Sequence, residues 1–555
     1  MFQRGTLLLA FFLLLSVKAF GQIAPVTGLR DNTPTVHAFT NARIVVAPGK
    51  VIAKGTLVIR DGTIESVGEN VTPPADARVW NMEGRTLYAG LIDLSSDYGF
   101  PKPVESQPVA TRGQAPPPPE KPKGAAHWNT RMMADFDASA EFQPDSKSAE
   151  KLRSQGFTLV LATPQRGIFR GSSALVNLGD GPVTDLVVKR KAAQAVTFEQ
   201  SQGFGGGYPG SLMGMIAFIR QSWIDADWYR NAWESYNTNP DQRRPETNTA
   251  LAALADAVQG RQPVIMEASS DLNFFRETKI GKEFSLNLLV RGSGDEYRRI
   301  DAVKSSKVPV IVTLNFPEAP NVATPEDALN VSLDELRDWD AAPENAGRLE
   351  KAGVLIALSA AELKDAGTFL AQARKAIERG LSSDGALAAL TTNPARWIGV
   401  DNQYGTLDKG KTANIVITDG DLLAEKTKIQ EVWIDGKRYE VKANPVADAR
   451  GTWSVELSIL PGTPETLTLK GENDKPTGSI KFMTQDVRLA TVTLSAERIA
   501  VTFSGDSIGH KGTVRMSGTV GEKDMYGVGE FPEGVPFTWS ATRTEPPKPE
   551  PDTTK

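Results

Sequence analysis

Four stretches between about residues 145 and 395 repeat one order of features: an amphipathic helix, a turn and a short apolar strand. They are "SAEKLRSQGFTLVLATP" (148–164), "TALAALADAVQGRQPVIMEA" (249–268), "EYRRIDAVKSSKVPVIVTL" (296–314) and "GRLEKAGVLIALSA" (347–360). Strands without polar alternation are typical of a parallel sheet that helices cover on both faces. Several such units over about 250 residues favour an α/β fold with a closed (β/α)8, TIM-like barrel over an open sheet.

Alternating apolar and polar residues flank this region on both sides. Residues 42–68, "ARIVVAPGKVIAKGTLVIRDGTIESVG", contain two turn dipeptides and predict a small antiparallel sheet. Beyond Gly405 the pattern again becomes hairpin-like, and residues 451–543 are almost wholly short alternating strands. These last strands predict a compact all-β module, a meander or a small barrel. The charged, proline-rich end, residues 544–555, predicts a disordered tail.

The N-terminus has the composition of a secretory signal. Arg4 precedes the apolar run "LLLAFFLLLSV" (7–17), and small residues follow up to residue 21. The run is shorter than the about 20 residues that a membrane-spanning helix needs, and no later stretch is apolar enough to span a bilayer. We therefore expect residues 1–21 to be removed and the protein to be exported, periplasmic or secreted; a retained anchor is the alternative. The chain contains no cysteine, so it uses neither disulfides nor thiolates.

The charge of the chain argues against one class of partner. Residues 1–21 contain two of the 62 basic residues and none of the 67 acidic ones, so the remaining chain has a net charge of 60 − 67 = −7. Nucleic-acid binding depends on clustered Lys and Arg, so we expect no nucleic-acid partner. The proline-rich segment 101–124 predicts an extended, solvated loop, and a ligand for a proline-binding domain is the alternative.

Several motifs together resemble the amidohydrolase superfamily, especially its imidazolonepropionase-like members. They are residues 40–68 with "TLYAGLIDL" (86–94), "ALAALTTNPARWIGV" (386–400), and "YGTLDKGKTANIVITDGDLL" (404–423) with "EVWIDGKRY" (431–439). The resemblance implies a composite domain, in which residues 22–88 and 401–445 form one small β-sandwich beside a barrel of residues 89–400. It leaves the 451–543 module unexplained.

The resemblance also implies a metal site at the C-terminal ends of the barrel strands. Family members bind one or two divalent metals through a His-x-His pair on the first strand, a lysine or glutamate in mid-barrel, histidines on the fifth and sixth strands, and an aspartate on the eighth. Imidazole and carboxylate ligands hold Zn²⁺ and leave a position open for a water, whose pKa the metal lowers to about 7. This chain has three histidines in total: His37, His127 and His510.

The residues at the family's ligand positions differ from these ligands. The His-x-His pair aligns with Ser95 and Asp97, the fifth-strand histidine with Glu267, the sixth-strand histidine with Arg291 and the aspartate with Ala360 or a neighbour. A guanidinium stays charged and would repel a dication by about 4 kcal/mol per charge pair at 4 Å and an effective dielectric constant of 20. We expect that the metal site is lost, that no cofactor is bound and that Arg291 pairs with Glu267 and Asp97.

Other candidate residues keep an alternative open. Asp97 and Glu267 could act as a general acid–base pair, or hold a cation that prefers oxygen ligands. In "GIFRGSSALVNLGDG" (167–181), Arg170, Ser172 and Ser173 are candidates to line the barrel mouth and hold an anionic group. His127, the single histidine of the barrel region, is a further pocket-lining candidate.

These observations predict an exported amidohydrolase-superfamily pseudoenzyme that acts by binding. We expect it to pair with a metal-containing amidohydrolase or with itself, and to bind a small amide or peptide. The aromatic residues of segment 215–236 suit such a protein interface. The alternative is a hydrolase of C–N bonds, of the cyclic amide or dipeptide type, with an atypical site; Zn²⁺ is expected only in that case.

Overall fold

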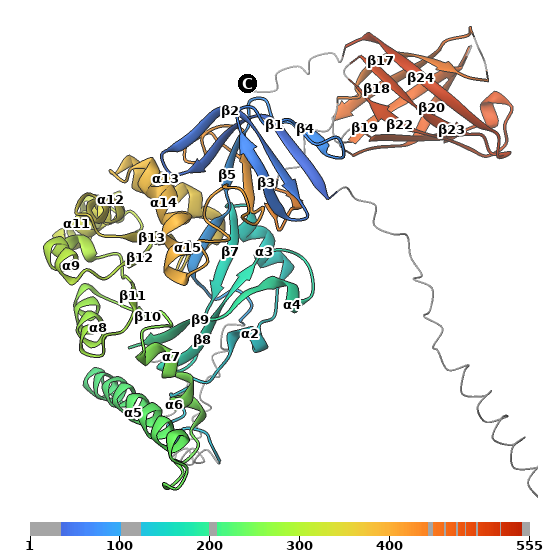
Figure 1. Ribbon diagram of the computed structural model, residues 1–555. Helices are drawn as coiled ribbons and strands as arrows, with labels where there is room; N and C mark the ends of the chain where they lie inside the picture. Colours follow the sequence, from blue (N-terminus) through green and yellow to red (C-terminus); the bar gives the residue numbers. More distant parts are fainter. Residues whose placement is uncertain are drawn as a thin grey trace, which may run out of the picture.

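The computed structural model describes three β-sheets (Figure 1). It describes residues 35–100, 124–198, 208–441, 448–459, 462–472, 475–482, 484–495, 498–521 and 523–546. The predicted signal peptide (1–21), the proline-rich segment up to residue 123 and the tail from residue 547 lie outside the described residues.

The first sheet joins two parts of the chain that are far apart in sequence (Figure 1). Its strand order is β16-β15-β14-β5-β1-β2-β3, with β4 paired to β1. The strands are β1 (Val36–Ala47), β2 (Lys50–Arg60), β3 (Thr63–Gly68), β4 (Arg78–Asn81), β5 (Thr86–Ala89), β14 (Ile415–Thr418), β15 (Ile429–Ile434) and β16 (Lys437–Glu440). Strand β14 runs antiparallel to β5, so the segments before and after the barrel share one core around Trp433.

The second sheet is barrel-like and has the order β13-β12-β11-β10-β9-β8-β7-β6. Its strands are β6 (Leu91–Ser96), β7 (Phe157–Ala162), β8 (Phe169–Asn177), β9 (Val187–Thr197), β10 (Val264–Glu267), β11 (Leu288–Arg291), β12 (Val310–Thr313) and β13 (Ile356–Ser359). Alternate residues enter two different clusters: Ile265 and Leu289 pack in the inner one, and Met266 and Val290 pack against the helices. Burial on both faces explains why these strands are apolar throughout.

Strand β8 corrects the prediction of an all-parallel barrel. It pairs antiparallel with both β7 and β9, whereas β6–β7 and β9 through β13 pair in parallel. Only residues 163–168 separate β7 from β8. A parallel crossover needs about a dozen residues or more, so this short connection can form only a hairpin.

Helices lie around the second sheet, and most of them cover its outer face (Figure 1). They are α2 (Ala138–Glu141), α3 (Ser146–Arg153), α4 (Val183–Leu186), α5 (Leu212–Thr238), α6 (Thr249–Ala253), α7 (Ala255–Val258), α8 (Asp271–Glu283), α9 (Ile300–Ser306), α10 (Pro325–Leu329), α11 (Leu333–Ala341), α12 (Asn345–Lys351), α13 (Phe369–Glu378), α14 (Ser383–Leu390) and α15 (Thr392–Ile398). Across the described part of the chain, none of the helices combines the length and the apolar character that a membrane span requires.

The third sheet is a closed eight-stranded antiparallel barrel (Figure 1). Its strands are β17 (Gly451–Leu457), β18 (Glu465–Glu472), β19 (Lys475–Phe482), β20 (Gln485–Ser495), β21 (Arg498–Ser504), β22 (Thr513–Val520), β23 (Asp524–Glu530) and β24 (Pro536–Glu545). Trp453, Phe503 and Trp539 are buried in its core. Each strand pairs antiparallel with the next, and β24 pairs with β17, so the predicted meander closes into the predicted small barrel. Strand β24 ends at Glu545, so the first two residues of the predicted tail lie in a strand.

Candidate functional site

A cavity of about 870 Å³ opens where strands β6 and β13 end. The last residues of β6 line its wall, and so does Ala360, which directly follows β13, as expected for the C-terminal mouth of a barrel. The lining residues are mostly polar: Asp93, Ser95, Ser96, Asp97, Tyr98, Gly99, Phe100, Gln143, Pro144, Asp145, Ser148, Lys151, Leu152, Gln165, Arg291, Ala360, Ala361, Glu362, Leu363, Lys364 and Ala366.

Two arginines converge on one buried carboxylate beside this cavity. Glu267 and Arg291 are the last residues of β10 and β11 and are paired in the strand register. Arg291 Nη2 lies 3.1 Å from Glu267 Oε2, and Arg170 Nη1 of β8 lies 2.6 Å from the same oxygen. The Glu267 side chain is only 5% exposed. Buried charges are stable only when paired, so the two guanidiniums and Glu267 hold one another in place.

Glu362 completes the group from the solvent side. Its Oε1 lies 3.0 Å from Arg291 Nη2, and its side chain is 44% exposed. Its backbone has a φ of 65°, in the left-handed region that non-glycine residues rarely adopt. Two arginines and two glutamates thus form a chain of ion pairs with no net charge, running from the buried Arg170 to the exposed Glu362.

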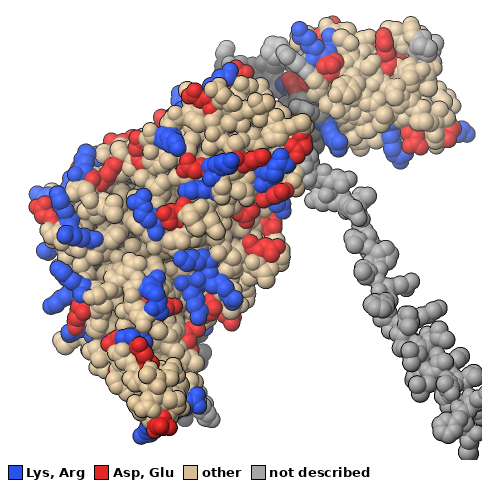
Figure 2. Space-filling view, viewed as in Figure 1, with Lys and Arg blue, Asp and Glu red and all other residues tan. Residues whose placement is uncertain are grey.

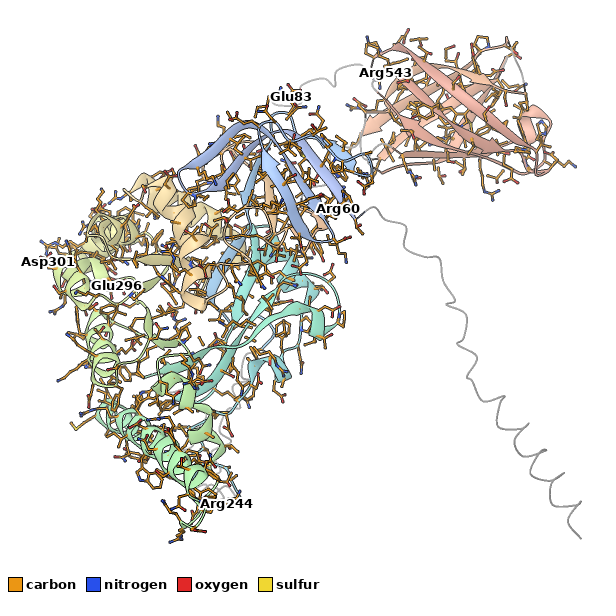
Figure 3. All side chains as sticks on the ribbon, viewed as in Figure 1. Arg60, Glu83, Arg244, Glu296, Asp301 and Arg543 are labelled. Carbon is orange, nitrogen blue, oxygen red and sulfur yellow. The ribbon has the colours of Figure 1, made fainter. Side chains whose placement is uncertain are left out.

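The loop after β11 is built around a second buried carboxylate, that of Glu296. Glu296 Oε1 accepts hydrogen bonds from the backbone amides of Ser293 at 2.8 Å and Gly294 at 3.3 Å, and Asn345 Nδ2 donates to Oε2 at 2.7 Å. A Cβ at Gly292 would lie 2.3 Å from Glu296 Oε1, so a larger residue there would have to displace this carboxylate. Glu296 is fully buried, and in Figure 3 it lies inward of the exposed Asp301, which is at the outer edge of the molecule. This loop begins directly after Arg291 and holds the end of its strand.

Asp93 links the two edge strands of the barrel-like sheet. Its carboxylate accepts hydrogen bonds from the Ser95 amide at 2.9 Å, from Ser359 Oγ at 2.5 Å and from the Ala360 amide at 3.0 Å. Ser359 Oγ also lies 3.1 Å from the Ser95 carbonyl oxygen. Burial raises the pKa of Asp93 to about 6, although these hydrogen bonds and the charge of Arg291 act to lower it.

The structure brings together most of the residues that the alignment selected. Ser95, Asp97, Arg291 and Ala360 line the cavity, and Glu267 lies beside it, paired with Arg291. The predicted Arg291–Glu267 ion pair is therefore present. Between the described residues Arg291 and Asp97 there is no ion pair within 4.0 Å; Glu362 takes the place that the sequence analysis gave to Asp97.

The three candidates on β8 are distributed differently. Arg170 lines a second cavity of about 260 Å³ that shares Phe100, Gln143 and Gln165 with the first. Ser172 Oγ donates to the Phe136 carbonyl and Ser173 Oγ bonds to Thr163 Oγ1, and neither serine is among the residues that line the two cavities. Alternate residues of β8 face opposite sides, which separates Arg170 from Ser173.

The three histidines lie away from the mouth of the barrel. His127 is buried in the loop before α2, where its Nδ1 accepts a hydrogen bond from the Asn129 amide, and burial lowers its pKa. His37 lies on β1 and accepts a hydrogen bond from Trp80 Nε1. His510 belongs to the C-terminal barrel and lies 3.1 Å from Glu533. None of the three lines the 870 Å³ cavity.

Three functional positions escaped the sequence analysis: Asp93, Glu296 and Glu362. Asp93 had a detectable signal, because a carboxylate inside the apolar run "LIDL" must find hydrogen-bond donors where the strand is buried. Glu296 and Glu362 look like ordinary surface residues in the sequence. Their roles depend on the loops that fold back toward β11 and were not visible beforehand.

Comparisons with known proteins agree with this architecture. Residues 341–439, from the end of α11 to β16, match a family model described as "Amidohydrolase family". An amidohydrolase from Thermotoga maritima MSB8 has a similar fold, with a TM-score of 0.58 and 23% sequence identity, over 73% of this chain and 99% of that one. The sequence matches no curated protein.

Two further solved structures match more distantly. A Xaa-Pro dipeptidase with bound methionine has a TM-score of 0.43 and 14% identity, over 73% of this chain and 100% of that one. A putative prolidase from Bifidobacterium longum has a TM-score of 0.42 and 14% identity, over 73% and 95%.

Proposed function

We propose that this protein is an amidohydrolase-like pseudoenzyme that acts by binding, without a catalytic metal. The observation that carries the proposal is the group Arg170–Glu267–Arg291–Glu362. Its two buried guanidiniums converge on one oxygen of Glu267, at the carboxyl ends of β10 and β11 and the amino end of β8. The family metal implied by the sequence resemblance would sit at this end of the barrel.

The donor set at the barrel mouth does not fit a zinc ion. Zinc takes imidazole, thiolate or carboxylate ligands at about 2.0–2.3 Å. Ser95 offers only a hydroxyl, Ala360 offers no side-chain donor, and Glu267 already accepts from two guanidiniums. Among the residues that the structure describes, no three histidine, aspartate or glutamate side chains cluster in a way that could hold a metal ion. The proposal therefore contains no metal-assisted step.

Metal content and hydrolysis test this proposal together. We expect the protein, purified without chelator, to contain much less than one equivalent of zinc, manganese or iron by mass spectrometry. We also expect no turnover of dipeptides or cyclic imides, with or without added Zn²⁺. One tightly bound metal per chain, accompanied by metal-dependent hydrolysis, would contradict the proposal.

We further propose a partner role, for which the exposed face of α5 offers the surface. Met213, Ile224 and Trp228 lie on this helix with large exposed side chains, and Trp128 is exposed near its start. In Figure 2 the lower end of the molecule, where α5 lies in Figure 1, shows mainly uncharged side chains. Exposed aromatic and apolar residues of this kind are enriched at protein interfaces.

Co-expression with a metal-containing amidohydrolase from the same genome tests the partner role. We expect the two chains to co-elute in size-exclusion chromatography, and Trp228→Ala together with Ile224→Ala to separate them. Self-association of the protein alone that the same double variant abolishes would instead assign this face to a homo-oligomer. Separate elution with a monomeric mass would contradict both forms of the partner role.

A hydrolase of cyclic amides or dipeptides is the second candidate. Four carboxylates line the cavity, those of Asp93, Asp97, Asp145 and Glu362, and carboxylates can act as general bases or bind oxygen-preferring cations. Stoichiometric bound metal and turnover that Asp97→Asn abolishes would favour this candidate over the pseudoenzyme.

Export also stays a proposal, supported by the composition of residues 1–21. Mass spectrometry of the mature protein from a cell fractionation would test it. We expect a chain that begins at residue 22, recovered outside the cytoplasm.

A further inference from the structure

We propose that the 870 Å³ cavity binds a small monocarboxylic acid whose carboxylate replaces Glu362 on Arg291. The inference rests on the proposed function in one respect: the barrel mouth must be free of a catalytic metal. It adds the chemical class of the ligand, the residue that binds it and the residue that it displaces.

Three of the four charged side chains at the site are buried, and the fourth, Glu362, is exposed and can be replaced by another anion. Arg170, Arg291 and Glu267 are buried, with side chains 8%, 12% and 5% exposed, and together carry one net positive charge. Glu362 neutralises that charge from the solvent side, where its side chain is 44% exposed. A buried cation needs an anionic partner, but nothing requires that this partner belong to the chain.

Glu362 is a partner that can leave easily. Exposed ion pairs contribute little to stability, because water solvates both charges once they separate. The left-handed backbone of Glu362 is unfavourable for a side chain with a Cβ, so its release lets the backbone relax. A ligand carboxylate can therefore form an ion pair with Arg291 with only a small loss of protein stability.

Arg291 can accept a new carboxylate in a second way. Its guanidinium lines the cavity, and its Nη2 serves both Glu267 and Glu362. Its Nε is buried and has no hydrogen-bond partner in the structure. A guanidinium binds carboxylates best through two parallel hydrogen bonds, so an incoming carboxylate can use donors that Glu362 leaves unused.

The other cations of the cavity restrict the ligand to one carboxylate. Lys364 is paired with Glu318, and Lys151 lies 2.7 Å from Asp365. Ser95, Ser96, Gln143 and Gln165 offer hydroxyl and amide groups in the same cavity. The carboxyl groups of Asp93, Asp97 and Asp145 also line it, and they disfavour a second carboxylate on the ligand. These neighbours suit a small acid with a polar body, such as a hydroxy acid.

Calorimetric titration with lactate, and with uncharged lactamide as the matched probe, tests the inference. We expect wild-type protein to bind lactate and not lactamide. Glu362→Gln removes the competing carboxylate, so lactate affinity should rise about fivefold, the size expected for release of an exposed ion pair. Glu318→Gln removes a carboxylate that is more exposed than Glu362 and pairs with Lys364, and it should change the affinity less than twofold.

Loss of Arg291 should abolish binding. Arg291→Gln should show no heat of lactate binding, and Arg291→Lys should bind more weakly than wild type because it lacks the two-donor fork; circular dichroism checks that both variants are folded. Absence of lactate binding in both wild type and Glu362→Gln overturns the inference. Equal gains in Glu362→Gln and Glu318→Gln, or binding that persists in folded Arg291→Gln, also overturn it.

The two proposals fail in different ways. Metal content measured on the same samples reports on the proposed function. If the protein contains no metal and does not bind lactate, only the present inference is contradicted. If it contains stoichiometric metal, the proposed function is contradicted.

Discussion

At the scale of single residues, burial decides what each charged side chain contributes. Glu267 and Glu362 both contact Arg291, yet one side chain is 5% exposed and the other 44%. The desolvated carboxylate cannot be removed without leaving charges unpaired in a low dielectric, whereas the exposed one is replaced by water. The same chemical group is therefore structural in one position and exchangeable in the other.

We predict that Glu267→Gln lowers the free energy of unfolding by about 3–5 kcal/mol, because Arg170 and Arg291 then lack their shared anion. Glu362→Gln, the matched change on the other side of Arg291, should cost less than about 1 kcal/mol. Urea denaturation of both variants measures the difference. Equal losses of unfolding free energy in the two variants would show that Glu267 is not the main stabilising anion of this group of ion pairs.

Asp93 gives the barrel a pH-dependent stability. Its pKa is about 6 in the folded protein against an ordinary value of 3.8, so between pH 4 and 6 the folded state keeps a proton that the unfolded state has lost. The contribution of Asp93 to stability therefore falls as the pH rises through this window, by about 3 kcal/mol in total, and is constant above it. Asp93→Asn has no such slope. Denaturation at pH 4.5, 5.5 and 7 should show wild type losing stability relative to the variant; a constant difference would contradict the assignment.

For Glu296 we predict that Gln is tolerated and Ala is not. Burial raises the pKa of Glu296, and its hydrogen bonds hold the loop after Arg291. In Glu296→Gln the new amide can donate to Asn345 Oδ1, which is buried without a hydrogen-bond partner, after a flip of Asn345. We expect a change below about 1 kcal/mol for Gln, and a loss of about 3 kcal/mol for Ala from the unsatisfied loop amides. Thermal unfolding of the two variants compares them.

At the scale of elements, connection length and face explain what the strands and helices do. The short β7–β8 connection turns one strand of the barrel-like sheet antiparallel. That reversal brings Arg170, near the start of β8, level with Glu267 at the end of β10, because β8 begins at the mouth where its neighbours end. Helix α5 buries Trp223 on one face and exposes Trp228 on the other.

The two tryptophans of α5 should respond differently to truncation. Trp223→Ala removes a fully buried side chain from the core and should cost about 3–5 kcal/mol of unfolding free energy. Trp228→Ala changes a side chain that is 63% exposed and should stay within about 0.5 kcal/mol. Chemical denaturation tests both. A large loss in Trp228→Ala at low protein concentration would place its face in the core rather than at an interface.

At the scale of the whole molecule, the C-terminal barrel has its own closed sheet and its own core (Figure 1). We predict that residues 448–546, produced alone, fold cooperatively, because every strand finds both neighbours within the segment. Circular dichroism should show β-structure and a single thermal transition. A noncooperative melt would show that the barrel depends on the rest of the chain.

The sequence by itself determined the order and type of the main elements. Apolar runs without alternation indicated strands buried on both faces, and the alternating runs after residue 451 indicated a sheet with one buried face. In both cases the spacing of the apolar residues along the sequence shows which faces of a strand are buried. The alignment with the ligand positions of the resembled family also predicted the Arg291–Glu267 pair, which the structure contains.

Three features were decided only by the tertiary structure. They are the direction of β8, the link that Asp93 makes between β6 and β13, and the ion pair of Glu362 with Arg291. Each depends on contacts between residues far apart in the chain, such as Asp93 with Ser359 and Arg170 with Glu267. No local pattern encodes which loop will supply the last partner of a buried charge. The partner is selected when the strands close and exclude water, because an unpaired charge is destabilising only once it is buried.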